Sequence, residues 1–304
     1  MRTVPLWIGA LAGLSLVAAC NSAAGGTGPA AGGSSGVSVV ASTNVYGDIV
    51  RQIAGDKVGV TSVIADPEQD PHSYEADSKT QLALSKARIV IENGGGYDDF
   101  MDTMLKSAGN SGATLINVVD VSGKTAPAGD ALNEHVWYDF PTVGRLVDRL
   151  VDALSAADAA DAATFRANAA TFKQRLAALE STEAQIRAAH AGAGVAITEP
   201  VPLYLLQACG LVNRTPAEFS EAIEEGTDIA PRVLQQTLAL FSGKAVALLA
   251  YNQQTAGPET VKLAGAAKDN RIAVVPVTET LPTGKDYLGW MTDNLAAVQN
   301  ALGG

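Results

Sequence analysis

Histidine, cysteine and aromatic residues are scarce in this chain, and each shortage narrows what the protein can be. Its 304 residues include three histidines and two cysteines, and aromatic residues make up 5%. So few cysteines exclude a disulfide framework, and so few aromatic rings argue against a wide aromatic binding cleft. Basic residues are also in the minority, with 21 Lys and Arg against 32 Asp and Glu. This acidic balance argues against nucleic acid as a partner.

A long apolar run lies at the N-terminus. Residues Val4 to Ala19 follow a short basic start and end in Val-Ala-Ala, directly before Cys20. This pattern is typical of an export signal and is too short for a membrane span. Its end resembles bacterial lipoprotein signals, so we predict a signal peptide over 1–19 and a lipid on Cys20. Two acyl chains would anchor the protein stably to the outer face of the cell membrane.

The next segment, residues 21–36, consists of small and polar residues with one proline. Such a composition cannot bury a core and is typical of a flexible tether. We therefore predict that residues 20–36 are a lipidated cysteine and its tether. The second cysteine, Cys209, lies in an apolar context and is expected to be structural.

Residues 37–304 alternate short apolar runs with helical patterns, which predicts an α/β fold with mostly parallel sheets. An N-terminal lobe is expected over 37–140 and a C-terminal lobe over 193–304. Strands are expected at 37–42, 58–65, 88–92, 114–118, 195–198, 245–251 and 272–278. Helices are expected at 45–53, 78–85, 97–107, 201–209, 230–241, 258–269 and 285–302.

The segment between the lobes, residues 141–192, has a different pattern. It begins with a helix near Pro141, breaks near 155–158, and continues as a run rich in Ala, Glu, Gln and Arg. A helix over 160–191 would be roughly 48 Å long at about 1.5 Å per residue. Its apolar stripe contains Phe165, Phe172, Leu176, Leu179 and Ile186. We expect a rigid helix that links two lobes, with the ligand site in the cleft between them.

Four polar residues are candidate ligands for a metal ion. His72 and His135 lie in loops downstream of apolar runs, and Glu199 and Glu279 directly follow strand-like runs. Ligands of open α/β sheets bind beyond the carboxyl ends of the strands. Two imidazoles and two carboxylates that meet there would suit a divalent transition metal. The same residue types are common at protein surfaces, so spacing alone leaves the alternatives open.

Two motifs around the histidines resemble the metal-binding solute-binding proteins of ABC transporters that import zinc or manganese. They are Asp-Pro-His-Ser-Tyr-Glu around His72 and His-Val-Trp-Tyr-Asp from His135. Thr-Glu at Glu199 and Thr-Glu-Thr at Glu279 fit the later part of the same pattern. The resemblance spans about 37–302 and implies a two-lobed fold with a linking helix. It implies that the metal is held by His72, His135, Glu199 and Glu279.

The pattern fits neither the zinc nor the manganese branch of these proteins. The segment 122–132 lacks the histidines that zinc importers often carry in this region. A glutamate as the third ligand is typical of manganese or iron, whereas manganese proteins usually have aspartate where Glu279 stands. The expected cargo is therefore Zn²⁺ or Mn²⁺, with Fe²⁺ as a third candidate.

The resemblance implies a non-enzymatic, monomeric binding protein that captures the metal outside the cell and delivers it to an ABC permease. Two alternatives belong to other classes. An extracellular zinc metallohydrolase would need an open water position on the metal, but His-Glu-x-x-His is absent from the sequence. A siderophore- or haem-binding protein of similar architecture would need a wide, aromatic or Arg-lined cleft. An adhesive role would not use the cleft, so the sequence leaves it open.

Overall fold

The computed structural model describes residues 36–67, 69, 71, 74, 77–126 and 131–303. These residues belong to one compact unit that runs from Ser34 to Gly304. The signal peptide, Cys20 with its tether, and His72 lie outside the described residues, so these predictions are untested. Within the described part of the chain, no helix is both long and apolar enough to cross a membrane.

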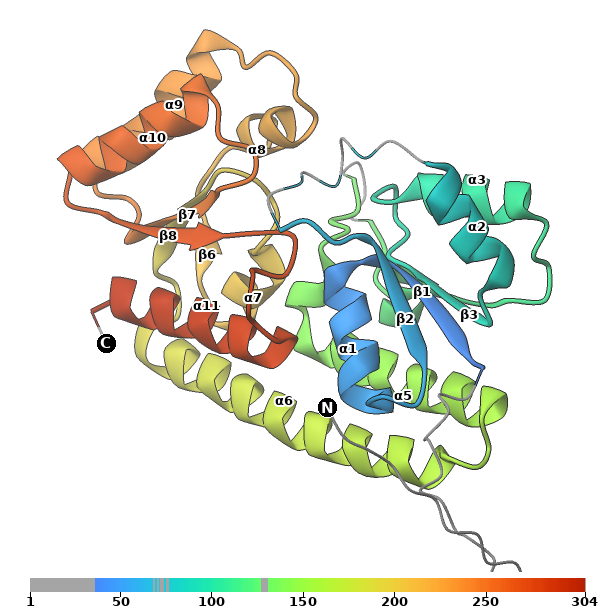
Figure 1. Ribbon diagram of the computed structural model, residues 1–304. Helices are drawn as coiled ribbons and strands as arrows, with labels where there is room; N and C mark the ends of the chain where they lie inside the picture. The colour runs from blue at the N-terminus through green and yellow to red at the C-terminus, as the bar shows by residue number, and fades with distance from the viewer. Residues whose placement is uncertain are drawn as a thin grey trace, which may run out of the picture. The chain divides into compact units, whose positions relative to one another are not determined.

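The N-terminal lobe is built on a four-stranded parallel sheet with the order β2-β1-β3-β4 (Figure 1). Strand β3 is buried along its whole length, as expected for an inner strand of a sheet covered on both faces. The strands are β1 (Ser38–Thr43), β2 (Gly59–Ile64), β3 (Ile89–Glu92) and β4 (Thr114–Asn117). The helices are α1 (Asn44–Ala54), α2 (Ser78–Lys86), α3 (Asp99–Ala108) and α4 (Val118–Ser122).

The C-terminal lobe repeats this topology. Its sheet is also parallel, and its order β6-β5-β7-β8 places the first strand of the lobe in the second position, as in the N-terminal sheet. The strands are β5 (Gly194–Ile197), β6 (Val212–Asn213), β7 (Leu248–Asn252) and β8 (Ala273–Val277). The helices are α7 (Leu203–Ala208), α8 (Ala217–Glu224), α9 (Pro231–Ser242), α10 (Pro258–Asp269) and α11 (Tyr287–Ala301).

A helical segment joins the two sheets. It contains a short 3₁₀ turn η2 (Val136–Tyr138), helix α5 (Phe140–Ala157) and the long helix α6 (Ala162–His190). Asp139 caps α5, because its carboxylate accepts a hydrogen bond from the backbone N–H of Thr142 at 3.0 Å. Helix α6 has 29 residues, so it is about 44 Å long at about 1.5 Å per residue. All five residues of the predicted apolar stripe on α6 are buried.

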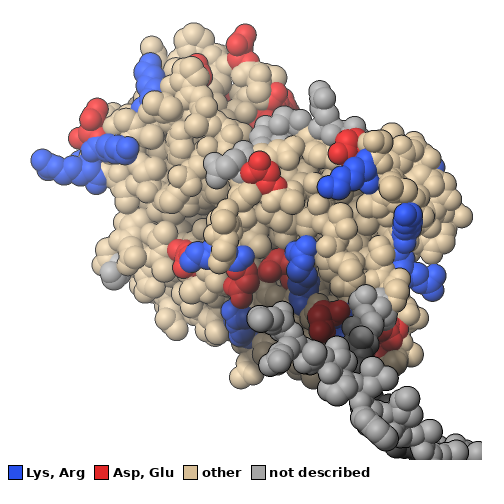
Figure 2. All heavy atoms as spheres, in the orientation of Figure 1, with Lys and Arg blue, Asp and Glu red and all other residues tan. Residues whose placement is uncertain are grey.

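One continuous hydrophobic core runs through both lobes. It includes β1, α1, α5 and the buried stripe of α6, and continues through β5, β7 and α11. Each sheet has a second, smaller core on its other face, formed with α2 and α3 in the N-terminal lobe and with α8, α9 and α10 in the C-terminal lobe. Acidic and basic side chains are interspersed on the face seen in Figure 2.

The structure confirms the predicted α/β fold with two mostly parallel sheets and a long helix. The sequence prediction missed α4, α8 and the two-residue strand β6, which are short elements. The residue limits assigned to the domains remain a prediction.

Candidate metal centre

The candidate site lies at the carboxyl ends of the C-terminal strands, where the N-terminal lobe reaches them through His135. Glu199 follows β5 after one residue, and Glu279 follows β8 after one residue. Asn252 is the last residue of β7, which lies between β5 and β8 in the sheet. Parallel strands end at the same edge, so these three side chains project from one place.

Asn252 joins the two carboxylates. Its side-chain amide donates one hydrogen bond to Glu199 Oε2 and another to Glu279 Oε1, the second at 2.9 Å. All three residues are buried, with exposed fractions of 2% or less. Two buried carboxylates repel one another when ionised, so a donor shared between them helps to hold them side by side.

His135 faces this pair from the other lobe. Its Nε2 lies 3.8 Å from Glu279 Oε2 and 3.6 Å from Glu224 Oε1, at the end of α8. Its Nδ1 lies 2.8 Å from Asn133 Oδ1, and a carboxamide oxygen can only accept. The proton of the neutral ring is therefore assigned to Nδ1, which leaves Nε2 as the nitrogen able to bind a metal.

Asn133 also ties His135 to the C-terminal lobe. Its Oδ1 accepts a second hydrogen bond, from the backbone N–H of His135 at 3.1 Å. Its Nδ2 donates to the carbonyl oxygen of Pro200 at 3.1 Å, and its own carbonyl accepts from the hydroxyl of Tyr204 at 2.7 Å. The residue that fixes the imidazole is thus bonded to the residue directly after Glu199.

The electrostatics of the site favour a bound cation. The pKa of Glu199 is raised to about 7, mainly by burial, with a smaller contribution from the nearby charge of Glu279. Burial opposes protonation of His135, but its hydrogen bond to Glu279 and the charges of Glu279, Glu134 and Glu224 outweigh that effect, so the pKa of His135 is raised. Glu199 therefore holds a proton more readily than usual because it is buried, and His135 does so because acids surround it. A divalent cation would supply a counter-charge and displace these protons.

Glu134 extends the acidic surroundings of the imidazole. Ligand atoms of Glu134, His135 and Glu224 lie within 4.8 Å of one another. His135 is buried, whereas Glu134 and Glu224 are only partly buried. The carboxylates beside His135 therefore extend from the buried pair toward the solvent.

Aromatic side chains form the wall behind His135. The rings of Tyr97 and Trp137 have centroids 6.0 and 5.1 Å from that of His135, and both residues are buried. Tyr138 continues this wall, and its hydroxyl donates to the carbonyl of Thr278 at 2.8 Å. The wall keeps water from the imidazole and restricts its orientation.

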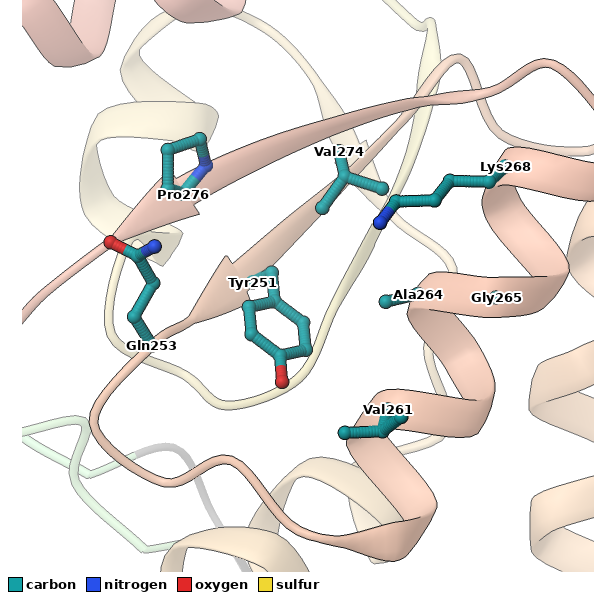
Figure 3. A pocket seen from close by; sticks show the side chains of 8 residues that line it. All are labelled: Tyr251, Gln253, Val261, Ala264, Gly265, Lys268, Val274 and Pro276. Carbon is teal, nitrogen blue, oxygen red and sulfur yellow. The ribbon is translucent and has the colours of Figure 1, made fainter.

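A separate pocket of 570 Å³ lies between the C-terminal sheet and α10, where residues of β7 and β8 also line it. Tyr251 and Gln253 point into it from either side of Asn252, and Val261 and Lys268 of α10 line it as well (Figure 3). Successive residues of a strand point to opposite faces, so Asn252 points away from the face on which Tyr251 lines the pocket. Of the candidate ligands that the structure describes, namely His135, Glu199 and Glu279, none lines this pocket.

Of the four ligands predicted from the sequence, three are brought together, namely His135, Glu199 and Glu279. The fourth, His72, lies outside the described residues. Sequence reasoning missed Asn252, although it ends a strand as the two glutamates nearly do, and it missed Glu224. No sequence signal marked Glu224, because α8 itself was not predicted.

The profile of the family described as zinc-uptake complex component A, periplasmic, matches residues 39–301. A manganese-binding lipoprotein, MntA of Halalkalibacterium halodurans, is 29% identical over 149 residues, which cover 48% of this chain and 48% of that protein. The iron ABC transporter substrate-binding lipoprotein MtsA of Streptococcus pyogenes is 32% identical over 98 residues, or 32% of this chain and 30% of that protein. The match thus spans about half, or less, of the length of these curated relatives.

Solved structures extend the likeness to nearly the whole fold. The crystal structure of ZnuA aligns with a TM-score of 0.71, covering 87% of this chain and 98% of that one. Its sequence identity of 20% makes this a likeness of fold alone.

Proposed function

The chain belongs to the family of periplasmic zinc-uptake complex component A, and on this premise we propose that it is an extracytoplasmic metal-binding protein of an ABC importer. It captures a divalent transition metal and delivers it to a permease in the cell membrane. The observation that carries this function is the meeting of His135 with Glu199 and Glu279 at the strand ends of the C-terminal lobe.

We propose that the ligands of the cargo are His72, His135, Glu199 and Glu279, with Glu224 as an additional carboxylate near the solvent. His135 supplies Nε2, because Asn133 holds its Nδ1. Imidazole nitrogen with carboxylate oxygens suits Zn²⁺, Mn²⁺ and Fe²⁺. The number of carboxylates allows coordination above four, which favours Mn²⁺ or Fe²⁺, whereas the Irving–Williams order favours Zn²⁺ at any such site.

The names of the relatives support the same proposal, since one is a manganese-binding lipoprotein and another is the substrate-binding lipoprotein of an iron ABC transporter. We therefore also propose a lipid on Cys20 and a tether that hold the protein at the outer face of the membrane. We propose further that the protein is a monomer. The comparisons do not favour the metallohydrolase or the siderophore- or haem-binding alternative.

The decisive test is the metal content of the full-length protein, purified in mild detergent. The protein is stripped of metal and offered equimolar Zn²⁺, Mn²⁺ and Fe²⁺ under reducing, oxygen-free conditions. Inductively coupled plasma mass spectrometry should find one equivalent of metal. Zinc alone would indicate the intrinsic preference of the ligands, and retained manganese or iron would indicate a higher-coordinate geometry.

Two variants assign the binding to the proposed ligands. His72→Ala should abolish tight binding, whereas His190→Ala should bind like the wild type, because His190 lies at the end of α6 and is not a proposed ligand. A wild-type protein that takes up no metal would overturn the proposed function. Unchanged stoichiometry and affinity in His72→Ala would remove His72 from the ligand set.

A further inference from the structure

Gln254 makes hydrogen bonds to both lobes next to Glu279. It lies two residues beyond the end of β7. Its Nε2 is 3.0 Å from the carbonyl oxygen of Pro67 and 3.0 Å from that of Gln69, both in the N-terminal lobe. Its Oε1 accepts the backbone N–H of Glu279 at 2.6 Å. One side chain therefore joins the backbone of a proposed ligand to the segment that follows β2.

The orientation of this carboxamide is fixed by its partners. Backbone carbonyls only accept, and a backbone N–H only donates, so the nitrogen must face Pro67 and Gln69 while the oxygen faces Glu279. The nitrogen also lies 2.8 Å from Thr280 Oγ1. Two amide hydrogens are thus shared among three acceptors, and the flipped amide would lose the three contacts with backbone groups.

Thr280 strengthens the same connection. It is fully buried, and its hydroxyl donates to the carbonyl of Pro67 at 2.9 Å. Its own carbonyl accepts from the hydroxyl of Thr278 at 2.9 Å, which closes a tight turn around Glu279. The peptide that carries Glu279 is therefore held from both sides, by its own lobe and by the N-terminal lobe.

We propose that Gln254 is a positioning residue of the metal site, which holds Glu279 against the N-terminal lobe and slows release of the metal. This inference rests on the proposed function. His135 and Glu279 belong to different lobes, and a cation bound between them can leave when the lobes separate. A bond between the lobes beside Glu279 opposes that separation. Partners of metal ligands that do not touch the metal typically change its affinity by about 10- to 100-fold.

The neighbouring residue provides a matched control. Gln253 has the same side chain and is exposed, and it points into the surface pocket on the opposite face of the sheet (Figure 3). Gln253→Ala removes the same atoms one residue earlier in the chain. It should leave the metal site unchanged.

The test compares Gln254→Ala with Gln253→Ala in the full-length protein in detergent, with Zn²⁺ and Mn²⁺ as probes. Metal dissociation is followed after addition of a strong chelator, and association by stopped flow. We expect dissociation about 10- to 100-fold faster in Gln254→Ala, with association and the melting temperature of the metal-free protein equal to those of the control. Hydrogen exchange at residues 64–69 should also be faster, although that segment is distant in the chain.

Gln254→Met, which keeps the length of the side chain without its polar atoms, should behave as Gln254→Ala does. Dissociation at the wild-type rate in both variants would overturn the positioning role while leaving the proposed function intact. So would faster dissociation that only accompanies a lowered melting temperature of the metal-free protein. A wild-type protein that binds neither metal would instead be a failure of the proposed function.

Discussion

The two lobes share one sheet topology but contribute different chemistry to the site. Each has four parallel strands in the same order, with its first strand in the second position. At the candidate site the N-terminal lobe places the imidazole of His135 with the partly buried carboxylate of Glu134, whereas the C-terminal lobe places the carboxylates of Glu199, Glu279 and Glu224. The difference shows that topology fixes where ligands emerge, while the residues that follow the strands fix what they can bind.

Hydrogen bonds join the two lobes beside these proposed ligands. Asn133 reaches Pro200 next to Glu199, and the hydroxyl of Tyr138 reaches the carbonyl of Thr278 next to Glu279. These hydrogen bonds hold the two halves of the candidate site together.

Glu279→Gln should weaken Zn²⁺ binding more than about 100-fold, since a lost ligand costs more than the about 10- to 100-fold typical of an outer partner. The change keeps the shape of the side chain but removes the negative charge that the C-terminal lobe places at this position. Competition against a fluorescent chelator measures the affinity. Glu180→Gln, on an exposed part of α6, is the control and should bind like the wild type. If Glu279→Gln binds Zn²⁺ with an affinity within threefold of the wild type, Glu279 is not a ligand of the metal.

Asn252→Leu should weaken binding about 10- to 100-fold. Leucine has the same branched shape, with methyl groups in place of the amide oxygen and nitrogen, but donates no hydrogen bond, so Glu199 and Glu279 lose the amide that holds them together. The same titration measures the effect, with Asn300→Leu at the exposed end of α11 as the control. If Asn252→Leu matches this control, the carboxylate pair does not depend on its bridging amide.

Acid should release the metal by protonating proposed ligands from both lobes. Burial raises the pKa of Glu199 to about 7, so the metal-free site is increasingly protonated as the pH falls below that value. The pKa of His135 is also raised, by Glu279 and the other acids against the effect of burial. Each such proton competes with the metal by about tenfold per pH unit below the pKa. Affinity measured from about pH 8 to pH 5 should therefore fall at least about 100-fold, and a flat profile would argue against these ligands.

Glu224→Gln should have the smallest effect, a loss of affinity of about tenfold or less. Glu224 is close to His135, but its side chain is 16% exposed, so solvent screens its charge more than that of Glu279 at 1%. Glu218→Gln, on the exposed side of the same helix, is the matched control. An effect as large as that of Glu279→Gln would make Glu224 an equal ligand rather than an outer one.

The sequence predicted the parts of this structure that follow from periodicity and strand ends. Glu199 and Glu279 could be predicted to lie close together because parallel strands direct their carboxyl ends to one edge. Asn252 obeys the same rule, but an asparagine at a strand end is also typical of an ordinary turn. Glu224 was missed because α8 is an eight-residue helix, and its contact with His135 depends on tertiary packing. The same holds for Gln254, whose partners are far away in the chain.

The continuous hydrophobic core makes the two lobes depend on each other for folding. The buried stripe of α6 packs in the same cluster as β1 of one sheet and β5 of the other. A cut between the lobes would expose apolar surface on both pieces, so neither piece should fold alone, and thermal unfolding should be a single transition. The two lobes therefore share one hydrophobic core, and exchange of either lobe for that of a relative should require matching changes in that core.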